Sequence, residues 1–235
     1  MKSVIIIIVI LLIILTVLRR NRQRSVRADY IRSYPFPPAL YEKLRQRRPE
    51  LALRDCQLVE DALRQFFLAY LQGGCRYVSM PSRVTDDLWH ELILYTRHYE
   101  LFCKKAFGRF MHHTPAVVLS KDKRNNTGLR RMWWFCCREE NIDPCKPSRL
   151  PLLFAIDYKL KIAGGFVYSP DCRALQNNNG ASSVVPYCGT DFSCADFDGT
   201  TDGFGDGADG SSDGGGDSGG DGGGHSCGGG CGGGD

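Results

Sequence analysis

The chain has 235 residues, with 30 basic and 26 acidic side chains and a formal net charge of +4 at pH 7. This charge is unevenly distributed: residues 1–173 hold all 30 basic residues and 16 acidic ones, a net charge of +14, whereas residues 174–235 hold ten aspartates and no base, a net charge of −10. Because the arginines concentrate after an apolar N-terminal run and no motif of interleaved aromatic and basic residues is present, we expect no nucleic-acid partner.

The N-terminal run "VIIIIVILLIILTVL", residues 4–18, contains no charge. As a helix it would be about 22 Å long, somewhat shorter than the roughly 30 Å hydrocarbon core of a bilayer. No small-x-small cleavage site follows it, and flanking arginines can extend it by reaching into the headgroups. We therefore expect a retained transmembrane anchor over residues 1–20 and not a cleaved signal peptide.

The charges on either side of this run predict its orientation. Lys2 precedes it, and five arginines follow it: Arg19, Arg20, Arg22, Arg24 and Arg27. The positive-inside rule then predicts a single-pass membrane protein whose C-terminal part lies in the cytoplasm. We expect a basic juxtamembrane linker over residues 21–35 beside the bilayer, with anionic lipid headgroups as partners. In that reducing compartment most of the eleven cysteines should be free thiols.

Residues 36–168 are expected to form one α-helical domain. Pro37 and Pro38 suit the first turn of a short helix that Pro49 ends. An amphipathic helix is predicted over residues 54–71, because apolar side chains recur there at steps of three and four and Gly73-Gly74 closes the pattern.

A further helix is predicted to begin at Ser82 or Thr85 and to continue without interruption to about Gly108. "LRRMWWFCCREEN" predicts another helix with a buried face, and "PLLFAIDYKLKIAGG" favours helix over strand. The fold class expected is all-α: a compact bundle of four to five helices preceded by the transmembrane helix.

The C-terminal segment, residues 169–235, is expected to be a disordered tail. From Gly199 onward 19 of 37 residues are glycine, interspersed with aspartate, serine and two cysteines. Such a segment buries too little apolar surface to offset the entropy lost on ordering. Its His225, Cys227 and Cys231 are candidate soft ligands for zinc or copper, or, with its serines, sites of modification, and the alternative is a solubilising tail without either role.

Candidate chemistry gathers in residues 83–115. Asp86 and His90 lie four residues apart, on one face of the predicted helix, and His112 and His113 follow soon after it. Histidine with carboxylate suits zinc or iron, so this set is a candidate metal or catalytic site, with Asp87 as an alternative carboxylate. The competing interpretation is structural: both aspartates complement the helix N-terminus and His90 hydrogen-bonds within a packed interface.

Cys103 is a further catalytic candidate, as a nucleophile near one of the histidines. It falls, however, within the apolar stripe of the predicted helix, where a cysteine is usually an inert hydrophobic residue.

The stretch "DDLWHELILYTRHYELFCKKAFGRFMHHTP" resembles the glycine-rich domain-containing protein-like family in its pattern of Asp-x-x-Trp-His, Ile-Leu-x-Thr, Phe-Cys, Phe-Gly and His-His-x-Pro. The resemblance covers roughly residues 50–120, and some bacterial members similarly look like membrane-anchored helical proteins with Gly/Cys-rich tails. It implies no activity, substrate or cofactor. Plant relatives look like proteins with Trp-His-x-His, where this chain has Leu92. The positions that carry the family motif are Asp86, Trp89, His90, Tyr99, Cys103, Gly108, His112, His113 and Pro115.

The sequence thus predicts a membrane-anchored helical module that binds or assembles with a protein partner it does not identify, and it favours such a module over an enzyme. The alternatives are a metal-dependent, hydrolase-like enzyme that uses Asp86, His90, His112 and His113, with zinc as the candidate cofactor, and a tail that itself binds metal or is modified.

Overall fold

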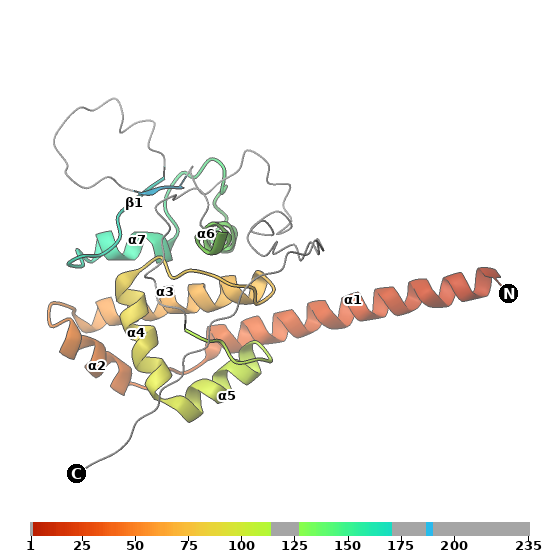
Figure 1. The fold of residues 1–235 in the computed structure, drawn as a ribbon, viewed down its shortest axis with the longest axis horizontal. Helices are drawn as coiled ribbons and strands as arrows, with labels where there is room; N and C mark the ends of the chain where they lie inside the picture. Colours follow the sequence, from red (N-terminus) through yellow and green to blue (C-terminus); the bar gives the residue numbers. More distant parts are fainter. Residues whose placement is uncertain (1, 114–126, 171–186, 190–235) are drawn as a thin grey trace, which may run out of the picture.

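The computed structural model describes residues 2–113, 127–170 and 187–189, and this part of the chain is predominantly helical (Figure 1). The expected all-α class is therefore confirmed. A long helix α1 (Lys2–Ser33) is followed by six shorter ones: α2 (Ala39–Arg47), α3 (Leu53–Gln72), α4 (Arg83–Leu94), α5 (Thr96–Ala106), α6 (Thr127–Glu139) and α7 (Leu152–Lys159). Two short strands, β1 (Tyr168–Ser169) and β2 (Tyr187–Cys188), pair in parallel.

Helix α3 is the centre of the helical domain and packs against α1, α2, α4, α6 and α7. Its side chains explain this position, because apolar residues occupy most of its circumference and not a single stripe. Phe66 and Phe67 are fully buried, with ring centroids 4.9 Å from Trp89 of α4 and from Phe102 of α5, respectively. Contacts of this kind bury large apolar areas and join α4 and α5 to the core.

Helices α4 and α5 correspond to the stretch that the sequence analysis expects to be one helix. That expectation is wrong at Tyr95, which leaves the helical conformation with a ψ of 59° and separates the two helices. Both sides of the break are amphipathic with large apolar residues, so the periodicity of the sequence gives no sign of it. The break lets α4 pack against α2 and α3 while α5 packs against α1.

Helix α1 projects from the domain, and its side chains from Val4 to Leu18 are exposed (Figure 1). By length and composition it could cross a membrane, a property that core helices and signal sequences share. Residues 21–33, expected to form a linker, continue the helix without a break. Its last turns enter the core, where Ile31 is fully buried.

Arg64 of α3 fastens the end of α1 to the domain. Its guanidinium donates hydrogen bonds to the carbonyl oxygens of Ile31 (2.7 Å), Arg32 (3.1 Å) and Tyr34 (2.7 Å). The last carbonyls of a helix have no partner within the helix and carry partial negative charge. A guanidinium supplies both the missing hydrogen-bond donors and a compensating positive charge. Helix α1 is thereby rigidly joined to the domain.

The N-terminus of α4 is held by Asp157, a buried residue of α7. Its carboxylate accepts hydrogen bonds from the Ser82 hydroxyl (2.8 Å), from the backbone N–H groups of Arg83 (2.7 Å) and Val84 (3.2 Å), and from the N–H of Phe166 (2.9 Å). The first N–H groups of a helix lack intrahelical partners, and a carboxylate there also complements the helix dipole. This contact fixes α4 against α7.

We predict that Asp157→Asn destabilises the fold by about 2–4 kcal/mol, because the amide group adds an N–H donor where the carboxylate accepts from buried N–H groups. Urea unfolding of the full chain in detergent, followed by tryptophan fluorescence, measures the change. Asp61→Asn, which removes an exposed carboxylate of α3, is the matched control and should alter stability by less than about 0.5 kcal/mol. Equal effects of the two substitutions would contradict this role of Asp157.

Candidate metal centre

The first two turns of α4 carry the first two residues of the candidate site. Ser82 caps this helix, since its hydroxyl accepts a hydrogen bond from the backbone N–H of Thr85 at 3.1 Å. Asp86 follows in the first turn and His90 one turn later, so both side chains leave the same face of α4, as the spacing of four residues predicts.

His113 comes from the segment after α5, and two buried hydrogen bonds bring that segment to α4. Trp89 Nε1 donates to the Tyr99 hydroxyl (3.2 Å), which in turn donates to the carbonyl oxygen of Met111 (2.7 Å). Burial raises the pKa of Tyr99, so this hydroxyl stays protonated and keeps its donor. The ring of His113 then lies against Trp89, with ring centroids 4.6 Å apart.

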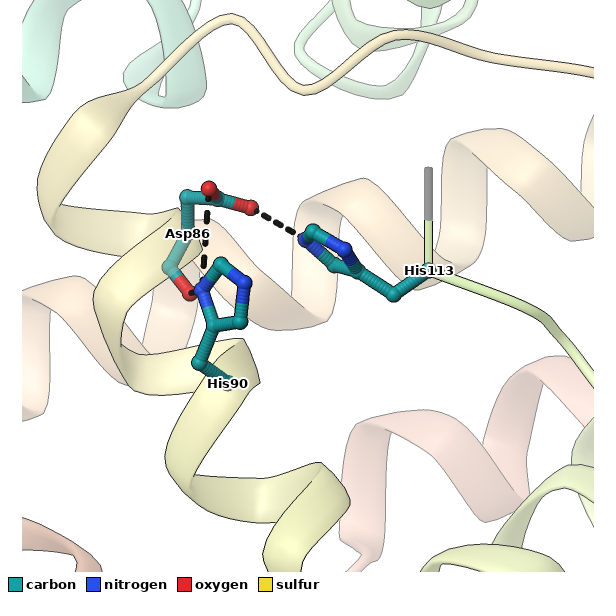
Figure 2. A group of neighbouring side chains, drawn as sticks. All are labelled: Asp86, His90 and His113. Carbon is teal, nitrogen blue, oxygen red and sulfur yellow. Dashed lines mark hydrogen bonds and ion pairs between the residues drawn. The ribbon is translucent and has the colours of Figure 1, made fainter. Parts of the chain in front are cut away.

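Asp86, His90 and His113 converge, and Figure 2 shows all three side chains directed at one another. One ligand atom from each residue lies within 4.8 Å of the other two. Nε2 of His113 is 2.9 Å from Oδ1 of Asp86, Nδ1 of His90 is 3.6 Å from Oδ2 of Asp86, and the two imidazole centroids are 4.1 Å apart. Asp86 and His113 are largely buried, whereas the His90 side chain is 42% exposed, so the cluster is open to solvent on one side.

The hydrogen bonds assign protons within the cluster. Nδ1 of His90 lies 2.8 Å from the backbone carbonyl oxygen of Asp86, and because a carbonyl only accepts, Nδ1 must carry the proton. Nε2 of His90 is then the nitrogen with a free lone pair. A ligating histidine typically donates its other ring N–H to a carbonyl or carboxylate in this way, which fixes the tautomer.

The neighbouring carboxylates have other partners. Asp87, the alternative carboxylate of the sequence analysis, faces α2, where Arg48 contacts it through Nη2 at 2.9 Å and Arg47 lies 3.7 Å away. Glu91 pairs with Nε of Arg47 at 2.9 Å. Asp86 is therefore the carboxylate that lies beside the two histidines.

Two other predicted residues lie away from this cluster. His112 is exposed and its ring contacts Phe110, with centroids 4.9 Å apart, because consecutive residues of an extended segment point in opposite directions. Cys103 is fully buried, and burial raises the pKa of its thiol, which excludes an exposed nucleophile. The tail candidates His225, Cys227 and Cys231 lie outside the described residues.

Two positioning elements of the site are absent from the sequence analysis. The Trp89–Tyr99–Met111 hydrogen bonds join residues 10 and 12 positions apart, and Asp157 acts on α4 across more than 70 residues. The polar atoms of Trp89 and Tyr99 could have indicated the first of these contacts, since buried tryptophan and tyrosine normally have hydrogen-bond partners. For the second contact, the only indication in the sequence is that Asp157 is the single acidic residue of an apolar helix.

Six cysteines of the described residues form no disulfide, namely Cys56, Cys75, Cys103, Cys136, Cys137 and Cys145, and Cys188 is disulfide-bonded. The prevalence of thiols agrees with expectation for the described part of the chain. Disulfides persist mainly in oxidising compartments, so the bond at Cys188 opposes the expected cytoplasmic placement of that segment.

The fold and the cluster together define a helical domain with an apolar N-terminal helix and a half-open Asp-His-His constellation. The chain belongs to the UCP032817-like family, whose model matches residues 26–192, well over half of the sequence. No curated protein and no solved structure matches the chain.

This family assignment corrects the expected membership of the glycine-rich domain-containing protein-like family, which is wrong. The shared pattern does not identify the family, because several of its positions are residues that pack helices together. Trp89, Tyr99 and Cys103 are buried core residues, and aromatic residues at helical spacing recur in unrelated helical domains. The match excludes both the apolar run and the glycine-rich stretch after Gly199.

We predict that iodoacetamide at pH 8 modifies exposed Cys145 in the native protein long before Cys103, Cys136 or Cys137. Burial raises the pKa of all three of these thiols, to about 12 for Cys137, so little thiolate is present and access is blocked. Peptide mass spectrometry resolves each site, and all four should react after denaturation. Native labelling of Cys103 at the rate of Cys145 would contradict its burial.

Proposed function

We propose that this protein is a membrane-anchored metal-binding protein, whose helical domain holds a divalent transition-metal ion of the zinc class at Asp86, His90 and His113. The observation that supports this is the convergence of three ligand atoms from two separate chain segments within 4.8 Å. Capping alone accounts for Asp86, but it does not account for two imidazoles directed at the same carboxylate.

The distances suit such an ion. Zinc binds nitrogen and oxygen at roughly 2.0–2.1 Å, so neighbouring ligand atoms of a tetrahedral site lie about 3.3 Å apart. The 2.9 Å between His113 Nε2 and Asp86 Oδ1 is close to that edge, and an ion would replace the proton that now joins the two atoms. Nε2 of His90, whose ring also lies against His113, is the nitrogen of that residue that could serve as the third ligand.

Three protein ligands would leave a coordination position for water or a ligand, which is the arrangement of catalytic zinc sites. The carboxylates nearest in sequence, Asp87 and Glu91, are both engaged by arginines at the C-terminal end of α2, Arg48 and Arg47 respectively. They are therefore poorly suited to act as a general base at this centre. We propose metal binding and do not assign a reaction.

Anchoring is the second part of the proposal. Helix α1 exposes an apolar surface over residues 4–18, none of which is buried by the part of the chain that the structure describes. Such a surface is stable in lipid and unfavourable in water. The five arginines that follow attract anionic lipid headgroups and favour the cytoplasmic side for the domain, whereas the disulfide at Cys188 favours the opposite side.

We predict one zinc or other transition-metal ion per chain in the full-length protein, purified in detergent without a metal-binding tag and measured by elemental mass spectrometry. The experiment is done in a background in which His225, Cys227 and Cys231 are replaced, so that the tail contributes no ligand. In this background His90→Ala, His113→Ala or Asp86→Asn should lower the metal content at least tenfold, because two remaining ligands bind zinc weakly.

The matched control is His112→Ala, which removes the histidine next to His113 but outside the cluster, and it should retain the ion. Near-ultraviolet circular dichroism checks that each variant is folded. A metal-free, folded parent, or equal losses in His112→Ala and His113→Ala, would overturn the metal proposal and leave the cluster a structural one.

We predict that Ile10→Arg releases the chain from membranes, since an arginine at the centre of a transmembrane helix costs about 2.5–3.5 kcal/mol on insertion scales. Carbonate extraction of membranes from expressing cells measures the fraction retained, and Ile10→Ala is the control. Intact mass of the membrane-bound wild-type chain should include residues 1–20. A chain that lacks these residues would show the apolar run to be a removed signal instead.

A further inference from the structure

A pocket opens on the side of the domain from which the apolar part of α1 projects. It has a volume of about 180 Å³, enough for several water-sized groups. Its walls come from the end of α3, the segment that leads to α4, and the segment after α5. In Figure 1 these ends of α3 and α5 lie beside α1 where it leaves the domain, and both helices contact α1. The lining residues used below are Tyr70, Cys75, Trp89, Arg109 and Met111.

This pocket is separate from the metal centre and is basic. Arg109 lines it, and Arg27 of α1 lies next to Arg109, because the Arg27 guanidinium rests on Gly108, within 2.3 Å of the place a Cβ would occupy. Burial raises the pKa of the Cys75 thiol in the wall, and Arg109, Arg27 and Arg24 oppose that rise, which puts all three guanidiniums near it.

The guanidiniums of Arg24, Arg27 and Arg109 have no acidic partner within ion-pair distance among the residues that the structure describes. This contrasts with the arginines on the opposite side of the domain, where Arg47 and Arg48 pair with Asp87. Neighbouring guanidiniums without an acidic partner repel each other unless an anion lies between them. Tyr70, Trp89 and Met111, which also line the pocket, are largely buried.

The depth of this pocket relative to a bilayer follows from the helix rise. Arg24 and Arg27 lie six and nine residues beyond Leu18, the end of the apolar run, or about 9 and 13 Å along the axis at 1.5 Å per residue. The headgroup layer adds roughly 5–7 Å to each side of the hydrocarbon core. Because the apolar run is some 8 Å shorter than that core, the helix is drawn inward and the arginines approach headgroup level.

We propose that this pocket binds the phosphate of an anionic lipid headgroup, with Arg109 and Arg27 as its phosphate-binding side chains. Guanidinium groups match phosphate oxygens in charge and fork geometry. The proposal rests on the anchoring of α1 proposed above, since the anchor brings the pocket to the headgroups, and it is independent of the metal ion.

The test uses the full chain in nanodiscs of phosphatidylcholine with a minority of phosphatidylglycerol, and native mass spectrometry of the released protein counts the lipids that stay bound. The wild type should retain one phosphatidylglycerol in preference to phosphatidylcholine. The double variant Arg27→Gln, Arg109→Gln should lose this preference roughly tenfold or more, because glutamine cannot replace the charged, forked pairing of a guanidinium with phosphate oxygens.

The matched control is Lys43→Gln, Arg97→Gln, which removes the same amount of positive charge from exposed positions of α2 and α5 away from the pocket. Its loss of preference should be at least about threefold smaller than that of the pocket variant, because it removes only general attraction to an anionic surface. Equal losses in the two double variants, or a wild type without preference, would overturn the pocket as a specific site and leave only diffuse attraction.

Two further arms separate the possible sources of phosphate and the two proposals. If a large excess of inorganic phosphate displaces the lipid from the wild type, the pocket binds a phosphate group that a soluble ligand supplies. If the lipid stays bound, the phosphate group is that of the lipid headgroup. A chain that fails to enter nanodiscs refutes the anchor and the lipid source together. A chain that enters them and shows no phosphatidylglycerol preference refutes the headgroup site alone.

Discussion

The carboxylate of Asp157 is the contact on which the arrangement of the domain depends. From α7, it accepts hydrogen bonds from the N-terminal N–H groups of α4 and from the N–H of Phe166. One buried carboxylate thus connects α7, α4 and the segment that contains Phe166. Gly165 is required beside it, since a Cβ there would lie 2.9 Å from the Asp157 Cβ. Because Asp86 is in the turn that Asp157 caps, any displacement of α7 would move the candidate metal centre as well. Stability and site geometry are therefore coupled in this fold.

Local patterns predict much of this structure. The periodicity of residues 54–71 predicts α3, and the four-residue spacing of Asp86 and His90 predicts their common face. Contacts between distant residues are not predicted. The sequence does not distinguish His112 from His113, because that choice depends on the conformation of the chain after α5 and on the Tyr99–Met111 hydrogen bond. The break at Tyr95 is hidden for a similar reason, since tertiary packing and not local propensity ends α4 there.

The motif around Trp89 serves the fold and the site together. Its indole packs on Phe66, holds Tyr99 through Nε1 and forms the surface on which His113 lies. The same residue also lines the basic pocket. A substitution at Trp89 would therefore disturb both proposed binding sites, whereas substitutions at His90 or Arg109 would affect one each. That separation allows the two proposals to be examined independently.

Helix α1 continues into the core without a break, and Arg64 binds its last carbonyl groups. The orientation of the proposed anchor is therefore coupled to the orientation of the domain. A flexible linker would let the domain rotate freely, whereas here any tilt of the helix becomes an equal tilt of the domain. An apolar segment shorter than the bilayer core tends to stay upright, because tilting would shorten its span further. In a thicker membrane the domain would be pulled closer to the lipid surface, and in a thinner one it would stand away from it. Bilayer thickness would thus set how firmly the basic face of the domain meets the headgroups.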